Sequence, residues 1–306
     1  MLDVALLGTG GMMPLPNRYL SSMCIRLNGR LILTDCGEGT QVTHKLLGWG
    51  YKNIDAILFT HFHADHISGL PGLLLTIANS CREEALTLIG PAGLAYIVKS
   101  LMVIAPEMPF EIRFIELPFE KGKEARFSAA GLNIRAYPLN HRIPCFAYSF
   151  TLPRTGRFDA ERAEAQDIPL KFWSLLQRGE TIKHNGRTFA PEMVLGPERP
   201  PLKVSYCTDT RYTRGLPSFI KGSDLFICEG LYGEDDKYDK AREHYHMIFR
   251  EAAACARDGR VGELWLTHFS PSLTDPEAHV GRLRGIFPNA RAGRDRMTTT
   301  LKFKDD

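Results

Sequence analysis

The sequence predicts an α/β or α+β fold with a large buried core. The chain has 306 residues and 44% of them are hydrophobic, so it can bury the core of one large domain or of two small ones. Apolar runs of strand length recur along the chain, and segments with helical character lie between several of them. The 27 glycines and 19 prolines are typical of a loop-rich enzyme rather than of a disordered chain.

The expected elements of the first half begin with a strand at Val4 to Leu7. Two strands then flank Asn28-Gly29, the strongest short signal for a hairpin turn. The near-continuous apolar run from Ile54 predicts a strand that is buried on both faces. After it, we expect helices at TIANS and YIVKSLMVI and strands at ALTLIG, FEIRFIEL, LNIRAYPL and FAYSF.

The second half begins with a change in composition. From 153 to 201 the chain is charged and interrupted by Pro and Gly, which predicts an arm inserted into a single domain spanning 1–306. Strands are then expected at LKVSYCTDT, SDLFICEG, ELWLTHFS and TTTLKF, with an apolar helix within HYHMIFREAAACA. A final helix is expected at 276–287, with Asp275 or Thr274 as its N-cap.

Composition also limits the compartment and the partners. Seven cysteines, an odd number without a CxxC pair, favour reduced thiols in a cytoplasmic protein. No apolar run reaches the length of a membrane span, and the N-terminus MLDVALLGTGG is expected to be a first strand, not a signal peptide. The net charge of +3, with both signs mixed, neither requires nor excludes a nucleic-acid partner.

The stretch LFTHFHADHISGL places three imidazoles and a carboxylate, those of His61, His63, Asp65 and His66, directly after an apolar strand. Imidazole and carboxylate are ligand types that zinc accepts. His61 and His63 alternate along an extended chain, so both point to one side, and Asp65 and His66 can face a second ion. A polar loop at the end of a strand is the simpler alternative, but the full HxHxDH pattern favours half of a metal site.

The other half of the site is expected from residues that follow later strands. His141, Asp209 and His268 each come directly after an apolar run, in LNHR, CTDTR and LTHFS. Taken alone, each could cap a loop or satisfy a backbone group. Together they complete two ligand sets, with Asp209 as the bridge: His61, His63 and His141 in the first, and Asp65, His66 and His268 in the second. Two metal ions about 3.5–4 Å apart can hold a shared hydroxide and clamp an ester oxygen.

In these motifs the chain resembles the metallo-β-lactamase fold superfamily, and within it the ribonuclease Z family of endonucleases, which trim the 3′ end of tRNA precursors. The likeness covers nearly the whole chain: LLGTGGMMP, LILTDCGEGTQ, THFHADHISGLPGLL, LNHR, CTDTR and LTHFS resemble that family's motifs in order and spacing. The resemblance implies a four-layer αββα sandwich with a protruding insertion. It also implies two zinc ions, with manganese or iron as alternative metals.

The resemblance assigns roles to further residues. ICEG and HYHMIFREAA resemble the family's stretch in which a glutamate supports a histidine, which places Glu229 and His246 at those positions. His246 would face the developing charge or protonate the leaving 3′ oxygen, and Asp65 would orient or deprotonate the attacking water. Asp35 would orient a metal-bound imidazole by accepting its other N–H. A solvent-facing His246, a surface ion pair of Glu229 and a turn-capping Asp35 are the simpler alternatives.

The chain departs from the family in its inserted segment and in its opening loop. The segment keeps basic residues but lacks the family's Gly-Pro turn, and an apolar cluster stands there instead: Phe172, Trp173, Leu175 and Leu176. Such a cluster predicts an arm that packs against the body or against the partner subunit of a homodimer. The opening loop keeps Arg18 but has Pro16 where the family has a lysine.

Three functions are compatible with these patterns. The first is a dinuclear zinc phosphodiesterase acting on tRNA precursors, with Arg18, Arg142 and Arg211 as candidate phosphate contacts unless they are simply solvated. The second is a hydrolase of the same fold that acts on small phosphodiesters or other esters. The third is a catalytically silent metal-binding or scaffold protein, which is disfavoured because every ligand position is filled. None of the three requires a membrane.

Overall fold

The computed structural model of the protein describes residues 1–304, and these divide into two compact units. The larger unit comprises Met1–Thr151 and Lys203–Lys302, and the smaller one comprises Leu152–Leu202 with the C-terminal residues from Phe303. The smaller unit begins and ends within one residue of the segment 153–201 that was expected to form an arm. Its role as an arm of a single domain stays a prediction.

The first sheet of the larger unit consists, within the described residues, of seven strands: β1 (Leu2–Gly8), β2 (Ser22–Leu27), β3 (Arg30–Thr34), β4 (Ile54–Leu58), β5 (Leu86–Pro91), β6 (Ile112–Leu117) and β16 (Thr298–Leu301). They lie in the order β16-β1-β2-β3-β4-β5-β6. Pairing is antiparallel from β16 to β3 and parallel from β3 to β6. The first and last strands of the unit are therefore neighbours in one sheet.

The second sheet consists, in the same described part of the chain, of seven strands: β7 (Ala125–Ala129), β8 (Leu132–Pro138), β9 (Phe146–Arg154), β12 (Arg199–Cys207), β13 (Leu225–Glu229), β14 (Glu263–Thr267) and β15 (Ala290–Ala292). They lie in the order β15-β14-β13-β12-β9-β8-β7. Pairing is antiparallel from β7 to β9 and parallel from β12 to β15. The carboxyl ends of β12, β13 and β14 therefore meet at one edge of the sheet, where polar residues from distant parts of the chain can form one site.

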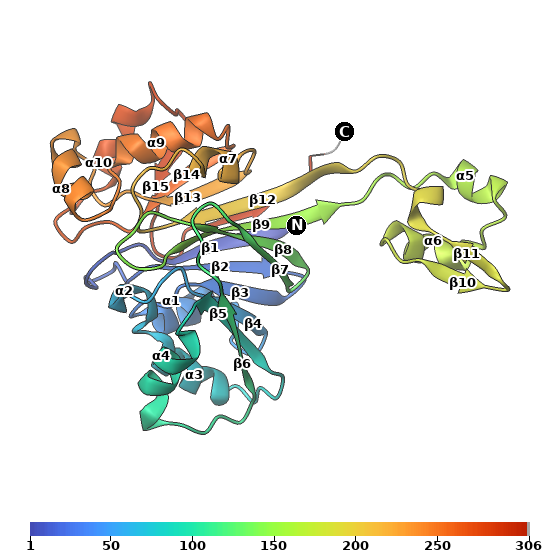
Figure 1. The fold of residues 1–306 in the computed structure, drawn as a ribbon, viewed down its shortest axis with the longest axis horizontal. Coiled ribbons are helices and arrows are strands. Elements are labelled where there is room, and N and C mark those ends of the chain that lie inside the picture. The colour runs from blue at the N-terminus through green and yellow to red at the C-terminus, as the bar shows by residue number, and fades with distance from the viewer. Residues whose placement is uncertain (305–306) are drawn as a thin grey trace. The chain divides into compact units, whose positions relative to one another are not determined.

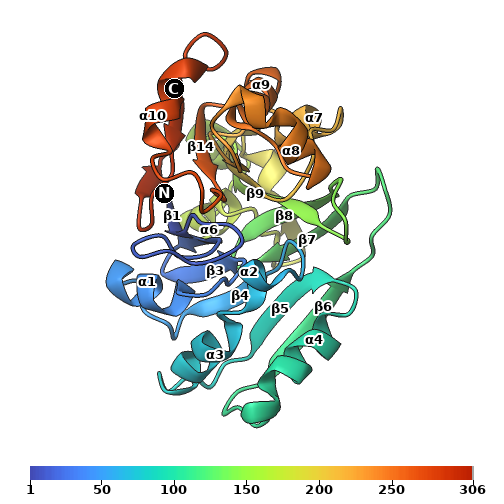
Figure 2. The same ribbon diagram turned by 90° about the vertical axis from the view of Figure 1, so that its left-hand side faces the viewer.

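Helices cover the outer faces of both sheets. On the first sheet lie α1 (Thr40–Leu47), α2 (Ala64–Ile67), α3 (Leu70–Ala78) and α4 (Leu94–Leu101), followed by the 3₁₀ turn η1 (Met102–Ile104). On the second lie α7 (Leu216–Ile220), α8 (Tyr238–Glu243), α9 (Phe249–Asp258) and α10 (Glu277–Val280), with the 3₁₀ turns η3 (Asp235–Lys237) and η4 (Gly281–Leu283). Figures 1 and 2 show the two sheets face to face between these helices. This arrangement confirms the predicted αββα sandwich.

Spacing of apolar residues explains why the longer helices pack as they do. In α3, the buried residues Leu70, Leu73, Leu74 and Ile77 follow the i, i+3, i+4, i+7 pattern of one helix face. The residues of α9 that face the second sheet repeat this spacing, beginning at Phe249. Fully burying one large apolar side chain contributes about 1.5–3 kcal/mol, so each face anchors its helix firmly.

The predicted hairpin is confirmed in detail. β2 and β3 pair antiparallel, with Leu27 opposite Arg30, so Asn28 and Gly29 form the two-residue loop. Their φ angles are 49° and 80°, which is the left-handed conformation that a type I′ turn needs at both positions.

Three features of the larger unit differ from expectation. The final helix is short, because α10 ends at Val280 and passes into η4, and Gly281 and Gly285 interrupt the segment that was expected to be helical as far as residue 287. Its N-cap is Pro276 rather than Asp275 or Thr274, although the Asp275 carboxylate still accepts the N–H of Ala278 at 3.4 Å. The strands β7 and β15 and the helices α1, α2, α7 and α8 were not predicted.

The smaller unit has its own apolar core. It contains α5 (Ala160–Ala165), α6 (Leu170–Gln177), β10 (Ile182–His184), β11 (Arg187–Phe189) and the 3₁₀ turn η2 (Pro191–Met193). Phe172 and Leu176 of α6 are buried against Ile168, Phe189 and Val194 of the same unit. Residues four apart on one helix face thus contribute to the unit's own core, and packing of the cluster against the body or a partner subunit stays a prediction.

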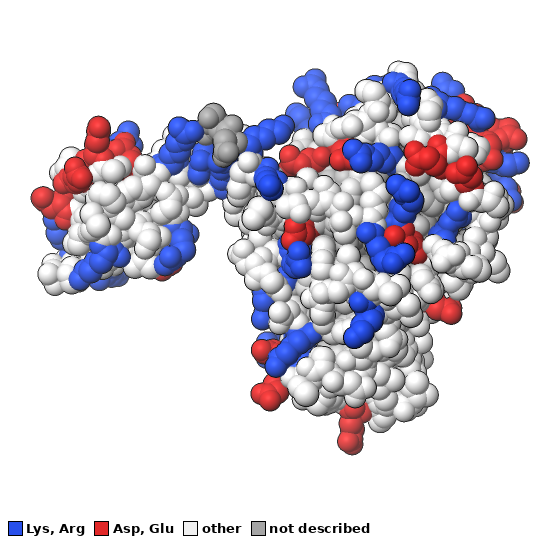
Figure 3. Space-filling view, turned by 180° about the vertical axis from the view of Figure 1, so that it is seen from behind, with Lys and Arg blue, Asp and Glu red and all other residues white. Residues whose placement is uncertain are grey.

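The surface carries both signs of charge. Figure 3 shows Lys and Arg interspersed with Asp and Glu over the visible face of the larger unit. None of the helices described between residues 1 and 304 combines the length and the apolar character needed to cross a membrane.

Candidate metal centre

The seven expected metal ligands follow strands of both sheets, as the sequence predicted. β4 precedes His61 and His63, α2 carries Asp65 and His66, and β8, β12 and β14 precede His141, Asp209 and His268. Asp209 and His268 have φ angles of 52° and 58°, in the left-handed region that residues other than glycine rarely adopt. The chain therefore turns sharply at the strand ends that present these side chains.

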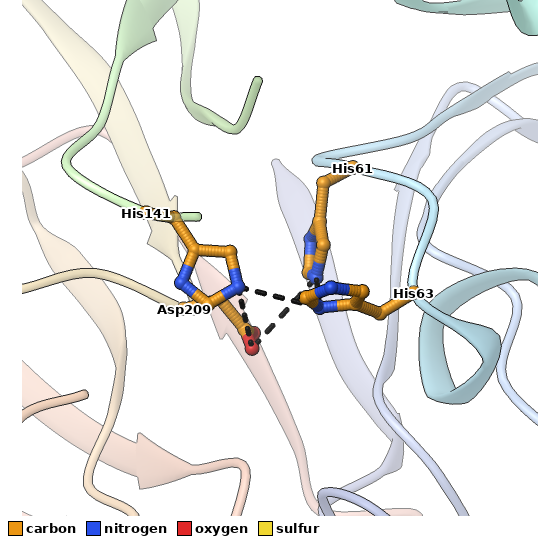
Figure 4. Close-up of side chains that lie close together, drawn as sticks. All are labelled: His61, His63, His141 and Asp209. Atoms are coloured by element: carbon orange, nitrogen blue, oxygen red, sulfur yellow. Dashed lines mark hydrogen bonds and ion pairs between the residues drawn. The ribbon is translucent and has the colours of Figure 1, made fainter. Parts of the chain in front are cut away.

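Three imidazoles and one carboxylate converge in the first group (Figure 4). Nε2 of His61 lies 3.0 Å from Nδ1 of His63, and Nε2 of His141 lies 3.3 Å from the same His63 atom. The Oδ1 atom of Asp209 is 3.8 Å from Nε2 of His61 and 4.0 Å from Nε2 of His141. The first expected ligand set is therefore brought together, with Asp209 at its side.

The second group lies on the other side of the same carboxylate. Nε2 of His66 lies 3.2 Å from Nε2 of His268, and Oδ2 of Asp65 lies 3.3 Å from that His268 atom. The Oδ2 atom of Asp209 is 3.1 Å from Nε2 of His66 and 3.3 Å from Nε2 of His268. One oxygen of Asp209 thus faces each group, which is the arrangement that a bridging carboxylate requires.

These spacings fit bound divalent cations. Two nitrogens about 2.0–2.1 Å from a tetrahedral zinc ion lie about 3.3 Å apart, close to the separations between the imidazole nitrogens. Among the described residues, the buried Oδ2 of Asp209 accepts no hydrogen bond, and the Nε2 atoms of His66 and His268 lie 3.1 and 3.3 Å from it. Nitrogens aimed at one another around an unpaired buried carboxylate oxygen are stabilised by a cation between them.

The protonation states of three expected ligands favour cation binding. Burial lowers the pKa of His61 well below its usual value, and burial likewise lowers the pKa of His141 to about 4. Burial alone would raise the pKa of the Asp209 carboxyl, but the imidazoles of His268, His66 and His61 lower it well below its usual value. Neutral imidazole and ionised carboxylate are the forms that bind metal. At a fourth expected ligand, His66, burial alone would lower the pKa, but the carboxylates of Asp209, Asp35 and Asp65 raise it well above its usual value.

Asp35 lies behind the second group. Its Oδ2 atom accepts a hydrogen bond from Nδ1 of His66 at 2.8 Å, and its Oδ1 atom accepts the N–H of Thr60 at 2.8 Å. Such a contact fixes the imidazole ring so that Nε2 points toward Asp209 and His268. Asp35 is fully buried and has a φ of 59°, so it is more than a solvent-facing turn cap.

Glu229 and His246 form a second buried carboxylate–imidazole pair. Oε2 of Glu229 is 3.0 Å from Nδ1 of His246, and its Oε1 accepts the N–H of Thr210. Burial alone would lower the pKa of His246, but the carboxylate of Glu229 raises it to about 9. His246 also stands close enough to Asp209 and His268 for its ring nitrogen to join a ligand group with them, all ligand atoms lying within 4.8 Å.

A cavity of about 460 Å³ opens beside this centre. His63, His141 and His246 line it from the metal side. Its other walls carry apolar, polar and cationic residues: Met12, Met13, Arg142, Leu231, Tyr232, Lys240, His244, Ser270, Pro271 and Ser272. Asp65 is tied to the same region, because its Oδ2 accepts the N–H of Met12 at 2.7 Å. The cavity combines apolar walls with positive charge, which suits a nucleotide.

The three candidate phosphate contacts occupy different places. Arg142 lines the cavity and donates to the Glu243 carbonyl at 3.0 Å. Arg18 lines a separate cavity and donates to the carbonyls of Leu273 and Thr274 at 2.7 and 3.0 Å. Arg211 lines neither, because its guanidinium is paired with a carboxylate inside the protein. The structure thus brings only Arg142 to the cavity, and contact with phosphate stays a prediction for all three.

Sequence reasoning missed several residues near the centre. Lys240 and His244 line the cavity on and just after α8, in the segment DKAREHYH, where two basic residues and a histidine precede His246. This basic run could have drawn attention to them. Cys145, by contrast, lies with its Sγ atom 3.7 Å from Nδ1 of His61, and nothing in the surrounding IPCFAY sequence signals that contact.

Comparisons with known proteins agree over the full chain. The chain is 55% identical to ribonuclease Z of Clostridium kluyveri over 306 residues, which is 100% of both chains. Among solved structures, human tRNase Z, short form, aligns with a TM-score of 0.70 and 25% identity over 98% of this chain and 100% of that one.

Two further matches are less specific. The metallo-β-lactamase fold protein YhfI of Bacillus subtilis aligns with a TM-score of 0.67 and 18% identity over 97% of this chain and 98% of the other, which shows the shared fold. Residues 2–155 match the sequence family described as Anti-Pycsar protein Apyc1. That segment holds the HxHxDH loop and His141 but lacks Asp209 and His268, so the full-length relatives are the more informative comparison.

Proposed function

The chain belongs to the ribonuclease Z family, and from this premise we propose that it is a metal-dependent endoribonuclease that cleaves tRNA precursors and releases their 3′ trailer. One structural observation supports the chemistry above all others: Asp209 directs one oxygen at each of two imidazole groups. A hydrolase of small phosphodiesters with the same fold is the competing function.

The proposed cofactor is a pair of zinc ions, with manganese or iron as alternatives. His61, His63 and His141 would hold one ion, Asp65, His66 and His268 would hold the other, and Asp209 would contact both. When bound, two such ions would lower the pKa of a water molecule and stabilise charge on the phosphoryl oxygens.

The protein's own residues would supply positioning and proton transfer. Asp65, held by the N–H of Met12, would orient the attacking water or take its proton. His246 would give a proton to the leaving 3′ oxygen, and Glu229 would keep its ring in place. Asp35 would fix His66 in the same way on the opposite side of the centre.

The larger substrate would be bound by positive charge outside the reacting atoms. Arg142 and Lys240 line the cavity beside the centre and would contact phosphates next to the cleaved bond. In the smaller unit, the exposed Lys171 and Lys183 are candidates for contact with more distant parts of the tRNA. We also propose that residues 153–201 act as an inserted arm of a single domain.

Two further proposals concern the state of the protein. A homodimer is proposed, and sedimentation or light scattering would test it. A cytoplasmic location is proposed because all seven cysteines are unpaired thiols in the described chain.

A paired assay tests the proposed function. The purified protein is analysed for bound metal and then assayed on a precursor tRNA and on bis(p-nitrophenyl) phosphate. Cleavage of both substrates, with the tRNA cut at the 3′ side, supports the proposal. Turnover of the small diester without cleavage of tRNA would favour the competing function, and no turnover of either by a metal-loaded protein would leave only a metal-binding role.

A further inference from the structure

Arg211 makes an unusual set of contacts two residues after the bridging carboxylate. Its Nη1 atom donates to Oε2 of Glu251 at 2.9 Å and also to the main-chain carbonyl of His246, while Nη2 donates to Oε1 of Glu251. The side chains of Arg211 and Glu251 are only 12% and 16% exposed. The ring of Tyr238 lies 5.1 Å from the guanidinium carbon. The arginine therefore has its donors directed into the protein.

Glu251 has a second task at the start of α9. It is the third residue of that helix, and its Oε2 accepts the N–H of Ile248 at 3.1 Å, which caps the helix. Because the same carboxylate holds Arg211, the guanidinium is fixed to a helix whose buried face is anchored in the core. The planar guanidinium of Arg211 donates two hydrogen bonds to the carboxylate of Glu251, a geometry that a lysine ammonium cannot reproduce.

The main chain around His246 needs such support. Tyr245, immediately before it, has a left-handed φ of 64°. The N–H of His246 donates to the Ala241 carbonyl at 2.8 Å, so its amide is held from one side while its carbonyl is held by Arg211. The hydrogen bond between Nδ1 of His246 and Glu229 orients the imidazole ring, but it does not fix the main chain of His246.

Arg211 also ties this segment to the loop of another ligand. Its own N–H donates to the Asn140 carbonyl at 3.1 Å, next to His141. One residue thus connects the chain at Asp209, the loop at His141 and the main chain of His246. A phosphate at Arg211 would have to displace an internal carboxylate that already satisfies both ends of its fork.

We propose that Arg211, held by Glu251, is a positioning residue: it fixes the main chain of His246 and so keeps the imidazole in place for proton transfer to the leaving group. The inference rests on the proposed function of His246 as proton donor. It gives Arg211 a role other than the phosphate contact that the sequence predicts. A positioning residue acts only through the group it positions, and that property can be measured.

The experiment is a double-mutant cycle with Arg211→Lys and His246→Ala, in the metal-loaded full chain. Two small diesters, diphenyl phosphate and bis(p-nitrophenyl) phosphate, differ in how much their leaving groups need a proton. Arg211→Lys should lower kcat on diphenyl phosphate by roughly tenfold or more, less than the about 10²–10⁴-fold expected for removing a general acid. It should change kcat on bis(p-nitrophenyl) phosphate much less and leave KM nearly unchanged. In the His246→Ala background the same substitution should cost less than about twofold.

Arg250→Lys is the matched control. Arg250 lies on α9 beside Glu251 and pairs with Asp235 at 3.3 Å, but both side chains are 64% exposed and neither lines the cavity. This variant should leave both rates unchanged. Glu251→Gln tests the same inference by a second variant, since it weakens the contact between Glu251 and Arg211 without changing Arg211 itself. Thermal unfolding checks that each variant is folded.

Two results would overturn the inference. A rise in KM with kcat unchanged makes Arg211 a substrate contact. An equal loss in the wild-type and His246→Ala backgrounds shows that Arg211 does not act through His246. Failure of the proposed tRNA substrate is a separate outcome, because it is seen in the wild-type enzyme on precursor tRNA and does not enter the cycle on small diesters.

Discussion

The Oε2 atom of Glu229 lies 3.0 Å from Nδ1 of His246, and both side chains are buried. Because Nδ1 is engaged by the carboxylate, Nε2 is the ring nitrogen left to exchange a proton in the cavity that His246 lines. The pair resembles Asp35 and His66 in form, but Asp35 supports a ring inside the proposed ligand set, whereas Glu229 supports one at its edge.

Replacing His246 should separate catalysis from metal binding. We expect His246→Ala to keep its metal and fold and to lose roughly 10²–10⁴-fold in turnover, the usual contribution of one general acid or base. The loss should be larger for precursor tRNA and diphenyl phosphate than for bis(p-nitrophenyl) phosphate, whose leaving group needs no proton. Glu229→Gln should show a weaker form of the same pattern. Loss of metal in step with activity would instead make His246 a ligand, as its distance to Asp209 and His268 allows.

Replacing Asp209 should disable both halves of the centre. Asp209→Ala is expected to reduce bound metal and abolish hydrolysis, because its two oxygens face different imidazole groups. Metal content by elemental analysis and turnover of the small diester are the measurements. Two tightly bound ions in an active Asp209→Ala protein would rule out the bridging scheme. Asp224→Asn, which alters a carboxylate that only accepts the N–H of Lys203, is the control.

Weakening the support of His66 should weaken metal binding. Asp35→Asn is expected to lower metal affinity by about 10-fold to 100-fold, the usual cost of altering a residue that orients a ligand. Competition with a chelator measures the affinity. Asp55→Asn is the matched control, since Asp55 belongs to β4 of the same sheet but pairs with Arg30 instead of a candidate ligand. Unchanged affinity in Asp35→Asn would leave Asp35 a structural residue only.

Removing charge from the cavity wall should affect RNA more than small diesters. Lys240→Gln is expected to raise KM for precursor tRNA and to reduce the salt dependence of binding by about one unit of slope, as for loss of one phosphate contact. Turnover of bis(p-nitrophenyl) phosphate should stay the same. Lys237→Gln is the control, because that lysine lies nearby but pairs with Asp236 and does not line the cavity. Equal effects of the two variants would contradict the proposed contact.

The smaller unit should matter for the large substrate alone. A deletion of residues 168–179 would test this, but it would also remove buried residues from the core of the smaller unit. Replacing exposed lysines changes the charge and leaves that core intact. The Lys171→Gln/Lys183→Gln double variant should weaken cleavage of precursor tRNA and spare the small diester, because these lysines would add binding energy for a large substrate without touching the reacting phosphate. The Lys99→Gln/Lys121→Gln variant removes the same charge from the larger unit. If both double variants impair tRNA cleavage equally, the smaller unit has no specific role in binding.

Sequence reasoning found the features that depend on local rules. Asn28-Gly29 fixes a hairpin through its own backbone preferences, and apolar runs followed by ligand-type residues mark the strand ends that carry His61 and His268. The final helix is predicted too long, because apolar residues keep helical spacing past Gly281. In the structure, the glycines and the change to 3₁₀ geometry end the helix at Val280.

Contacts between distant segments were beyond such rules. The sequence offers Arg211 as a candidate phosphate contact or a solvated arginine, and only the fold reveals Glu251 opposite its guanidinium. The cluster with Phe172 and Leu176 was predicted to pack against the body or a partner subunit, because nothing in the sequence shows that Phe189 of β11 joins them in a core of the smaller unit. In both cases the partner lies at least 13 residues away in sequence and is selected by packing, which no spacing rule encodes.

The division of ligands between two sheets also has a consequence for biosynthesis. A nascent chain leaves the ribosome with His61, His63, Asp65 and His66 long before His141 and Asp209 exist, and His268 comes almost last among 306 residues. A copy that ends before His268 therefore carries at most six of the seven expected donors. Such a fragment, released early from translation, would lack one donor of the second group and could not form the complete proposed centre.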